Sequence, residues 1–311
     1  SLPSTFGFCG ADGSTIEHIS IDGINLTGHI PASIGSCASL QRLVFSITNL
    51  QGSIPSSLRH LTQLQTLVLS TTGLQGSIPP SIWQLPHLQT LVIEDLNVVD
   101  AVNNDPHDPR FYKLHGSLPS TFGFCSAAGS TIEYMYLRGI NLTGNIPASI
   151  GTCASLQYLG LSHTTLEGPI PSSLGNLTQL QTLVLTTMGL KGSIPPSIWQ
   201  LPCLQTLVIQ DFNVVDTVYN HPYDPRPSKL QGSLPSTFGF CSAAGSTIEV
   251  MYIRSINLTG HIPASIGTCA SLQYLALSHT SLEGPIPSSL GNLTHLQALF
   301  LITTGLQGSI P

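Results

Sequence analysis

Seven cysteines give this chain its most regular candidate chemistry. Six of them fall into pairs whose members are 28 residues apart: Cys9 with Cys37, Cys125 with Cys153, and Cys241 with Cys269. Two thiols held at the right separation oxidise to a disulfide, and such bonds persist in oxidising compartments. Cys203 is left over, because the matching position 116 residues earlier is His87. We expect Cys203 to be a free, half-buried thiol.

Asparagine side chains are the second candidate, because Asn-Leu-Thr is an acceptor sequence for N-linked glycans in secreted proteins. This tripeptide begins five times: at Asn25, Asn141, Asn176, Asn257 and Asn292. The competing interpretation is structural, since an inward leucine between two polar residues needs no glycan to explain it. We predict N-linked glycans at these five positions, provided that the protein is secreted.

Acidic, serine and histidine residues offer weaker chemistry. Asp100, Asp105 and Asp108 are close enough in sequence to supply oxygen ligands for Ca²⁺. The matching segment has His221 in place of Asp105, which favours a solvated turn. Serine–histidine neighbours recur at 162–163 and 278–279, but neighbours on a strand point to opposite faces and no acid completes a triad. The sequence therefore predicts no enzyme, no metal site and no cofactor.

The elements that position these residues follow from one repeating unit, which is clearest from Leu156 to Gln179. Its first half, LxxLxL, starts eleven times: at Ile16, Leu40, Leu64, Leu88, Ile132, Leu156, Leu180, Leu204, Ile248, Leu272 and Leu296. The unit predicts one coil with a short strand, a turn, an Ile-Pro corner and a loosely helical return. Such a coil cannot bury its own leucines, so neighbouring coils must stack. Stacking gives a parallel sheet with strands about 4.7–4.9 Å apart and leucines inside.

The full pattern LxxLxLxxxxLxGxIPxxLxxLxx resembles the plant-type leucine-rich repeat, and the resemblance covers nearly the whole chain. It implies an α/β solenoid: a right-handed coil with a parallel β-sheet on the concave face and irregular or 3-10 helical returns. One position departs from the family. The ninth residue of the unit is normally Asn, but here it is an apolar residue or Thr, as at Ile24, Ile140 and Thr164. We expect apolar packing at this turn in place of an asparagine ladder.

Stacked coils also explain the spacing of the cysteines. The two members of each pair occupy the same phase in adjacent coils, each six residues after a proline of the repeat. Equivalent atoms of stacked coils are about 5 Å apart, within the Cα separation that a disulfide accepts. We predict the bonds Cys9–Cys37, Cys125–Cys153 and Cys241–Cys269; the alternative is buried thiols that only fill space. Three disulfides indicate an extracellular location, either secreted or in a cell wall.

A second period of 116 residues overlies the first, because SLPSTFGFC begins at Ser1, Ser117 and Ser233. We predict one continuous solenoid over 1–311, built of blocks 1–116, 117–232 and the incomplete 233–311. Loop insertions rich in Pro and Asp are expected at about 97–113 and 213–229. Segments 117–195 and 233–311 differ at 12 of 79 positions, which indicates recent tandem duplication or selection for a repeating lattice.

Composition excludes several classes of function. Charged residues make up 8% of the chain and hydrophobic residues 41%, with a net charge of −6 and a pI of about 5.9. A basic surface for nucleic acid is therefore not expected. No apolar run approaches the roughly 18 residues that a membrane span needs, so we expect no membrane span in this segment. We also expect this segment to lack a signal peptide, as a mature or partial chain would.

The strands carry an apolar stripe between their inward leucines. Its members are Val44, Val68, Val92, Tyr136, Val184, Val208, Tyr252 and Phe300. On the concave face, an exposed apolar stripe favours binding to another protein. An ordinary strand surface rich in β-branched residues is the competing interpretation. Threonines and serines beside the stripe also suggest ice binding, but the valines and tyrosines interrupt the regular threonine array that this activity needs.

Two functional hypotheses remain, both non-enzymatic. The first is a glycosylated, extracellular structural protein whose copies stack end to end into a fibre or scaffold. This hypothesis is favoured by the near-identical blocks, the low charge, the regular disulfides and the ends without the caps of the family. The second is a recognition module, which is similar to receptor-kinase ectodomains and polygalacturonase-inhibiting proteins of plants. That resemblance implies an extracellular protein or peptide as partner, bound on the concave face.

Overall fold

The computed structural model describes residues 1–9, 15–95, 112–126, 129–211, 228–242, 245–302 and 304–309. The expected insertions lie outside these residues except for 112–113 and 228–229, and so do the calcium candidates Asp100, Asp105 and Asp108. The chain forms two compact units, Ser1–Thr165 (unit 1) and Leu166–Pro311 (unit 2). Each unit is described by itself below, and a single continuous solenoid stays a prediction.

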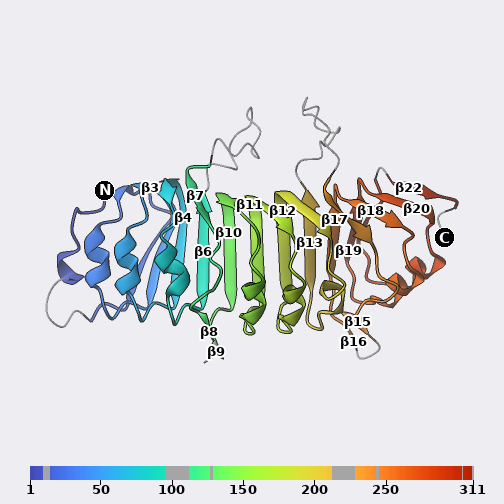
Figure 1. Cartoon of the computed structure of the whole chain (residues 1–311), viewed down its shortest axis with the longest axis horizontal. Helices are drawn as coiled ribbons and strands as arrows, with labels where there is room; N and C mark the ends of the chain where they lie inside the picture. Colours follow the sequence, from blue (N-terminus) through green and yellow to red (C-terminus); the bar gives the residue numbers. More distant parts are fainter. Residues whose placement is uncertain are drawn as a thin grey trace. The chain divides into compact units, whose positions relative to one another are not determined.

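Unit 1 contains a parallel sheet with one long strand from each coil (Figure 1). In pairing order the strands are β1 (His18–Asp22), β3 (Arg42–Gly52), β4 (Thr66–Leu74), β6 (Thr90–Asp95), β10 (Tyr134–Thr143) and β11 (Tyr158–Pro169, which ends beyond the unit boundary). Short strands form further parallel ladders: β2 (Thr27–His29) pairs with β3, and β7 (Leu114–Ser117) pairs with both β5 (Gly76–Ser77) and β10. The predicted parallel sheet is confirmed.

Unit 2 repeats this arrangement. Its long strands pair in the order β12 (Thr182–Ser193), β13 (Thr206–Asp211), β17 (Val250–Arg254), β19 (Tyr274–Ser278) and β21 (Ala298–Phe300). Its second ladder contains β14 (Leu230–Ser233), which also pairs with β12, then β18 (Asn257–Gly260), β20 (Ser281–Pro285) and β22 (Gly305–Gln307). Each unit also has one two-stranded antiparallel pair: β8 (Cys125–Ser126) with β9 (Gly129–Ser130), and β15 (Cys241–Ser242) with β16 (Gly245–Ser246).

The return half of each 24-residue coil contains a short 3-10 helix, as expected from the pattern, whereas the described return residues of the two long coils form turns and short antiparallel strands. In unit 1 these are η1 (Gly7–Cys9), η2 (Ala32–Ser36), η3 (Ser56–His60), η4 (Pro80–Gln84) and η7 (Ala148–Thr152). In unit 2 they are η8 (Ser172–Asn176), η9 (Ile198–Gln200), η11 (Ala264–Thr268) and η12 (Ser288–Asn292). The proline of the Ile-Pro corner precedes most of them, as Pro31 does at φ −71°. Proline favours this position because its φ is fixed near that value and a helix start does not use its missing N–H.

The core consists of the aliphatic residues at the repeated strand positions. Leu43, Leu67 and Leu91 are fully buried and lie in register on β3, β4 and β6. Each covers the next, which is why a coil acquires a core only by stacking. At roughly 1.5–3 kcal/mol for each fully buried aliphatic side chain, this repeated burial is the main driving force for folding.

The ninth position of the unit only partly follows our expectation. Ile140 is fully buried and Ile256 is 1% exposed, but Ile24 is 57% exposed in the first coil. Thr164 is also fully buried, and its hydroxyl has no hydrogen-bond partner among the described residues. A buried, unsatisfied hydroxyl costs about 1–3 kcal/mol.

The three predicted cysteine pairs are joined by disulfides in the structure. Their Cα atoms are 4.5 Å apart at Cys9–Cys37, 4.6 Å at Cys125–Cys153 and 4.5 Å at Cys241–Cys269. Each bond links the return segments of two adjacent coils. Cys203 is half-buried and takes part in no disulfide.

Candidate recognition face

The outward positions of the long strands form a surface in each unit, which we call the strand face. In unit 1 the predicted stripe residues Val44, Val68, Val92 and Tyr136 lie in register on four successive strands. Val68, Val92 and Tyr136 are half-buried, whereas Val44 is only 6% exposed. The accessible part of the stripe in unit 1 is therefore centred on the last three.

In unit 2 the stripe runs through Val184, Val208 and Tyr252, again in register. The same row continues through Ala276, which is 3% exposed, to Phe300, which is 48% exposed. The predicted members thus share one row of paired positions in each unit, and their role in binding stays a prediction. The sequence did not distinguish the stripe residues whose side chains are accessible to a partner from those whose side chains are buried.

An aromatic cluster dominates the strand face of unit 1. The rings of Tyr134 and Tyr158 stack with centroids 4.2 Å apart, and Tyr136 meets Tyr158 edge-on at 6.0 Å. Burial raises the pKa of Tyr134 and Tyr136, and burial together with Tyr134 raises the pKa of Tyr158 to about 12. All three hydroxyls are therefore neutral hydrogen-bonding groups at physiological pH. Tyr134 and Tyr158 were absent from the predicted stripe because they precede it by two residues on their strands.

Gly160 makes room for this cluster. It follows Tyr158 on β11 and pairs with Tyr136 in the register. A Cβ atom at this position would overlap the ring of Tyr136 and lie 3.0 Å from Cε1 of Tyr158. The two rings therefore lie over the glycine, and its missing side chain sets their positions.

Replacing Gly160 by alanine should push the Tyr136 ring out of this position. We expect a loss of about 1 kcal/mol in the free energy of unfolding, because a methyl group is forced into a packed site whose obstructing atoms belong to a mobile side chain. The tyrosine signal in near-ultraviolet circular dichroism should fall as well. Gly7→Ala is the matched control, since nothing lies within 4 Å of that Cβ position. An unchanged tyrosine signal in Gly160→Ala would contradict the role of Gly160.

An ion pair lies beside the cluster. Arg138 on β10 donates from Nη1 to Oε1 of Glu94 on β6 over 3.1 Å, and Ser70 on β4 donates to Oε2 of Glu94 over 2.8 Å. The side chains of Arg138 and Glu94 are 27% and 14% exposed. Sequence reasoning missed this group, although Glu94 and Arg138 pair directly in the register. The long coil separates Glu94 and Arg138 by 44 residues instead of 24. The usual spacing of 24 residues between paired positions therefore does not predict this contact.

The strand face of unit 2 has different polar groups. Gln210 occupies the position of Glu94, opposite Arg254. Arg254 donates from Nη1 to the Tyr252 hydroxyl over 3.1 Å, and burial lowers the pKa of its guanidinium. Burial and the charge of Arg254 also lower the pKa of His279. Tyr274 donates to Oε1 of Gln297 over 3.0 Å at the far side of this face.

The five Asn-Leu-Thr asparagines differ in their position and in their exposure to solvent. Asn176 and Asn292 are exposed at the last residues of η8 and η12. Asn25 and Asn257 are also exposed. Asn141 is half-buried, and its Oδ1 accepts a hydrogen bond of 2.6 Å from Thr165. Four of the five amide groups are therefore open to solvent, and glycosylation itself stays a prediction.

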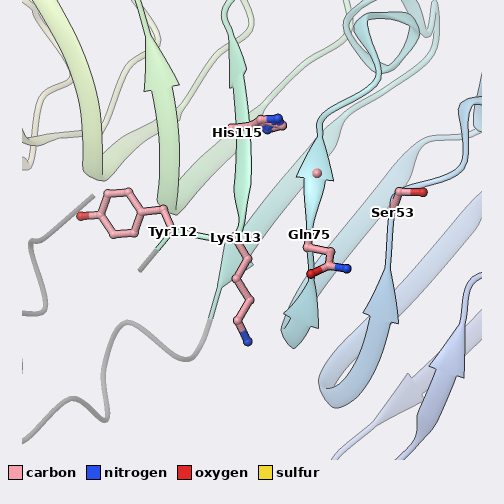
Figure 2. Close-up of a pocket in the computed structure, with 6 residues that line it drawn as sticks. Ser53, Gln75, Tyr112, Lys113 and His115 are labelled. Carbon is pink, nitrogen blue, oxygen red and sulfur yellow. The ribbon is translucent and has the colours of Figure 1, made fainter. Parts of the chain in front are cut away.

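A shallow depression in unit 1 was not anticipated from the sequence. It measures about 660 Å³ and is lined by Ser53, Gln75, Gly76, Tyr112, Lys113 and His115. Gln75 lies between β4 and β5 and Lys113 directly precedes β7, and Figure 2 shows the ring of Tyr112 directed away from Gln75. The described lining of the depression is polar and includes no carboxylate and no thiol, so these residues offer no paired acids. Within the described residues, no three His, Cys, Asp or Glu side chains gather as a metal site would require, and no helix is long and apolar enough to span a membrane.

The fold and the strand face define the class of this protein. A family model described as Leucine Rich Repeat matches residues 63–85, 155–177 and 271–293. The chain is a leucine-rich repeat protein with repeats of the plant type. No curated protein sequence matches it significantly.

Solved structures of plant receptors share the fold. A TDR receptor aligns with a TM-score of 0.74 and 27% identity over 96% of this chain and 45% of that chain. The plant peptide hormone receptor RGFR1 in complex with RGF2 gives 0.64 and 28% identity over 95% and 49%. The ectodomain of the membrane receptor kinase GASSHO1/SCHENGEN3 from Arabidopsis thaliana, in complex with CASPARIAN STRIP INTEGRITY FACTOR 2, gives 0.59 and 31% over 95% and 36%. The chain thus spans less than half the length of each receptor chain.

Proposed function

We propose that the chain is an extracellular recognition module, without enzymatic activity of its own, that binds a peptide or protein partner through its strand face. The likeness to receptor ectodomains, one of them a peptide hormone receptor in complex with its ligand, supports this proposal. The three disulfides fit an extracellular location. Exposed and half-buried aromatic residues on the face, such as Tyr136 and Phe300, are the residue types enriched at protein interfaces.

The position of the differences between two near-identical blocks carries the proposal. Segments 117–195 and 233–311 differ at 12 of 79 positions. Five of the 12 pairs are outward positions of the long strands or their direct continuation: Tyr134 and Val250, Gly160 and Ala276, Thr182 and Ala298, Val184 and Phe300, and Thr186 and Ile302. A face that adapts to different partners accounts for changes gathered there.

Exposure alone does not account for them. The helices η7 and η11 both read ASIGT, and η8 and η12 both read SSLGN, although residues such as Ala148 and Asn176 are exposed. The helices of the return side are thus unchanged between the blocks, and the exposed Gln179 of the turn after η8 becomes His295, whereas five pairs on the strand face differ.

Self-stacking into a fibre or scaffold, our first hypothesis from the sequence, stays a prediction. End-to-end stacking would use the flanks of the coils, so it gives no reason for the strand face to differ between blocks. N-linked glycans and the choice between secretion and a cell wall stay predictions too. Glycans at Asn176 and Asn292 would lie on the return side, leaving the strand face open.

The test is selection of phage-displayed random peptides on the wild-type protein, followed by binding to the variant Val68→Glu/Val92→Glu. Both valines are half-buried on the strand face of unit 1. A carboxylate at each would place two charges on the apolar stripe, so we expect peptides selected for unit 1 to lose at least about tenfold in affinity.

Ala32→Glu is the matched control, because Ala32 is exposed on η2 at the return side. It should leave peptide binding unchanged. Selected peptides that bind wild type and the double variant equally well, or a selection that enriches no sequence, would overturn the proposed function.

A further inference from the structure

Beside its aromatic cluster, the strand face of unit 1 carries one ion pair of opposite charges. Glu94 and Arg138 are the charged side chains of the strand positions that flank Tyr136, and they bind each other over 3.1 Å. The three tyrosines add no charge, since burial raises the pKa of each hydroxyl. A partner segment lying across Val92 and Tyr136 therefore meets rings, methyl groups and a neutralised pair.

The carboxylate of Glu94 is held in place by two hydrogen bonds. Ser70 binds one oxygen of its carboxylate and Arg138 the other, so three successive strands fix its orientation. Because the Glu94 side chain is 14% exposed and that of Arg138 27%, solvent screens the pair less than it would screen a surface pair. Removing one partner would leave the other as an uncompensated charge within the face.

We propose that Glu94 sets the charge specificity of the strand face of unit 1. By neutralising Arg138 it makes this face select extended, uncharged peptide segments that carry an aromatic or proline ring for the tyrosine cluster. This assignment rests on the proposed function, and it adds the chemical class of the partner and the residue that determines it.

The chain itself contains the exchange that tests this assignment. Gln210 stands at the position of Glu94 in the next block, at the same register opposite an arginine. Glu94→Gln therefore introduces a residue that this type of coil already accommodates at that position.

The experiment repeats the peptide selection on wild type, Glu94→Gln, Arg138→Gln and the double variant. Wild type should enrich peptides with Tyr, Trp, Phe or Pro and deplete both acidic and basic residues. Glu94→Gln leaves the positive charge of Arg138, so it should bind peptides rich in Asp and Glu at least about tenfold more tightly than wild type does. Arg138→Gln should shift selection in the opposite direction, towards Lys and Arg, and the double variant should restore the wild-type composition.

Each outcome separates this inference from the proposed function. Near-ultraviolet circular dichroism of every variant establishes that its tyrosine cluster is intact, and the two single variants test the same charge in opposite senses. If wild type selects acidic peptides, or if neither single variant changes the composition, the role of Glu94 is wrong. Peptides that still depend on Val68 and Val92 would then leave the proposed function standing, whereas peptides independent of both valines would overturn the proposed function.

Discussion

Replacing both Cys125 and Cys153 by serine should lower the free energy of unfolding of unit 1 by about 3 kcal/mol. The disulfide closes a loop with a sequence separation of 28, and a cross-link of that size restricts the unfolded chain by about this amount in the chain-entropy description. Both residues are at least 95% buried, so the two serine hydroxyls would add a desolvation cost. Urea unfolding of the oxidised wild type and of the variant measures the difference.

Cys203→Ser is the control for the loss of a sulfur atom alone. Cys203 is half-buried and outside any disulfide, so we expect a change within about 0.5 kcal/mol. Reduction of wild type with dithiothreitol should destabilise it at least as much as the double serine variant. A double variant as stable as wild type would contradict a stabilising role for this bond.

Gly267→Ala should cost unit 2 about 2–3 kcal/mol. Gly267 lies in η11, and a Cβ atom there would overlap the backbone oxygen of Ser289 and approach its Cβ to 2.7 Å. These atoms belong largely to the backbone of the adjacent coil and cannot rotate away, so the two coils would have to separate. The shift of the urea midpoint, together with faster amide hydrogen exchange in η11 and η12, measures the effect.

Gly291→Ala provides a control at the same position of the next coil. Gly291 lies in η12, and nothing is found within 4 Å of its Cβ position. Alanine restricts the unfolded chain more than glycine does, so this variant should be unchanged or more stable by up to about 1 kcal/mol. Equal losses in both variants would mean that helix conformation, not the close approach of coils, explains the glycine.

The sequence predicted those parts of the fold that depend on a fixed offset along the chain. Leu43 and Leu67 are 24 residues apart and lie in register, and Cys125 and Cys153 meet because they share a phase in adjacent coils. In a solenoid, each coil packs against the coils that precede and follow it in the sequence. The number of residues between two positions is therefore enough to predict their contact, which is not so in other folds. The row of valines and tyrosines on the strand face followed from the same rule.

The candidate site itself was only partly predictable, because its contacts depend on individual side chains. The stacking of Tyr134 on Tyr158 requires the space above Gly160, and the Glu94–Arg138 pair spans the coil that breaks the usual offset. Ile24 is exposed although buried equivalents occur at Ile140 and Ile256, because exposure also depends on what covers a coil. The periodicity of the sequence describes the average coil and does not predict differences between individual side chains at equivalent positions.

The parallel register has a consequence for how such a surface evolves. Gly160 contacts Tyr158 on its own strand and Tyr136 on the adjacent strand. A mutation at Gly160 therefore perturbs two neighbouring coils and leaves distant coils undisturbed. In a globular core the same mutation would propagate through a shared interior. The effect of a mutation is therefore local. Gene duplication followed by drift in single coils can generate new surface chemistry while the hydrophobic interior stays constant.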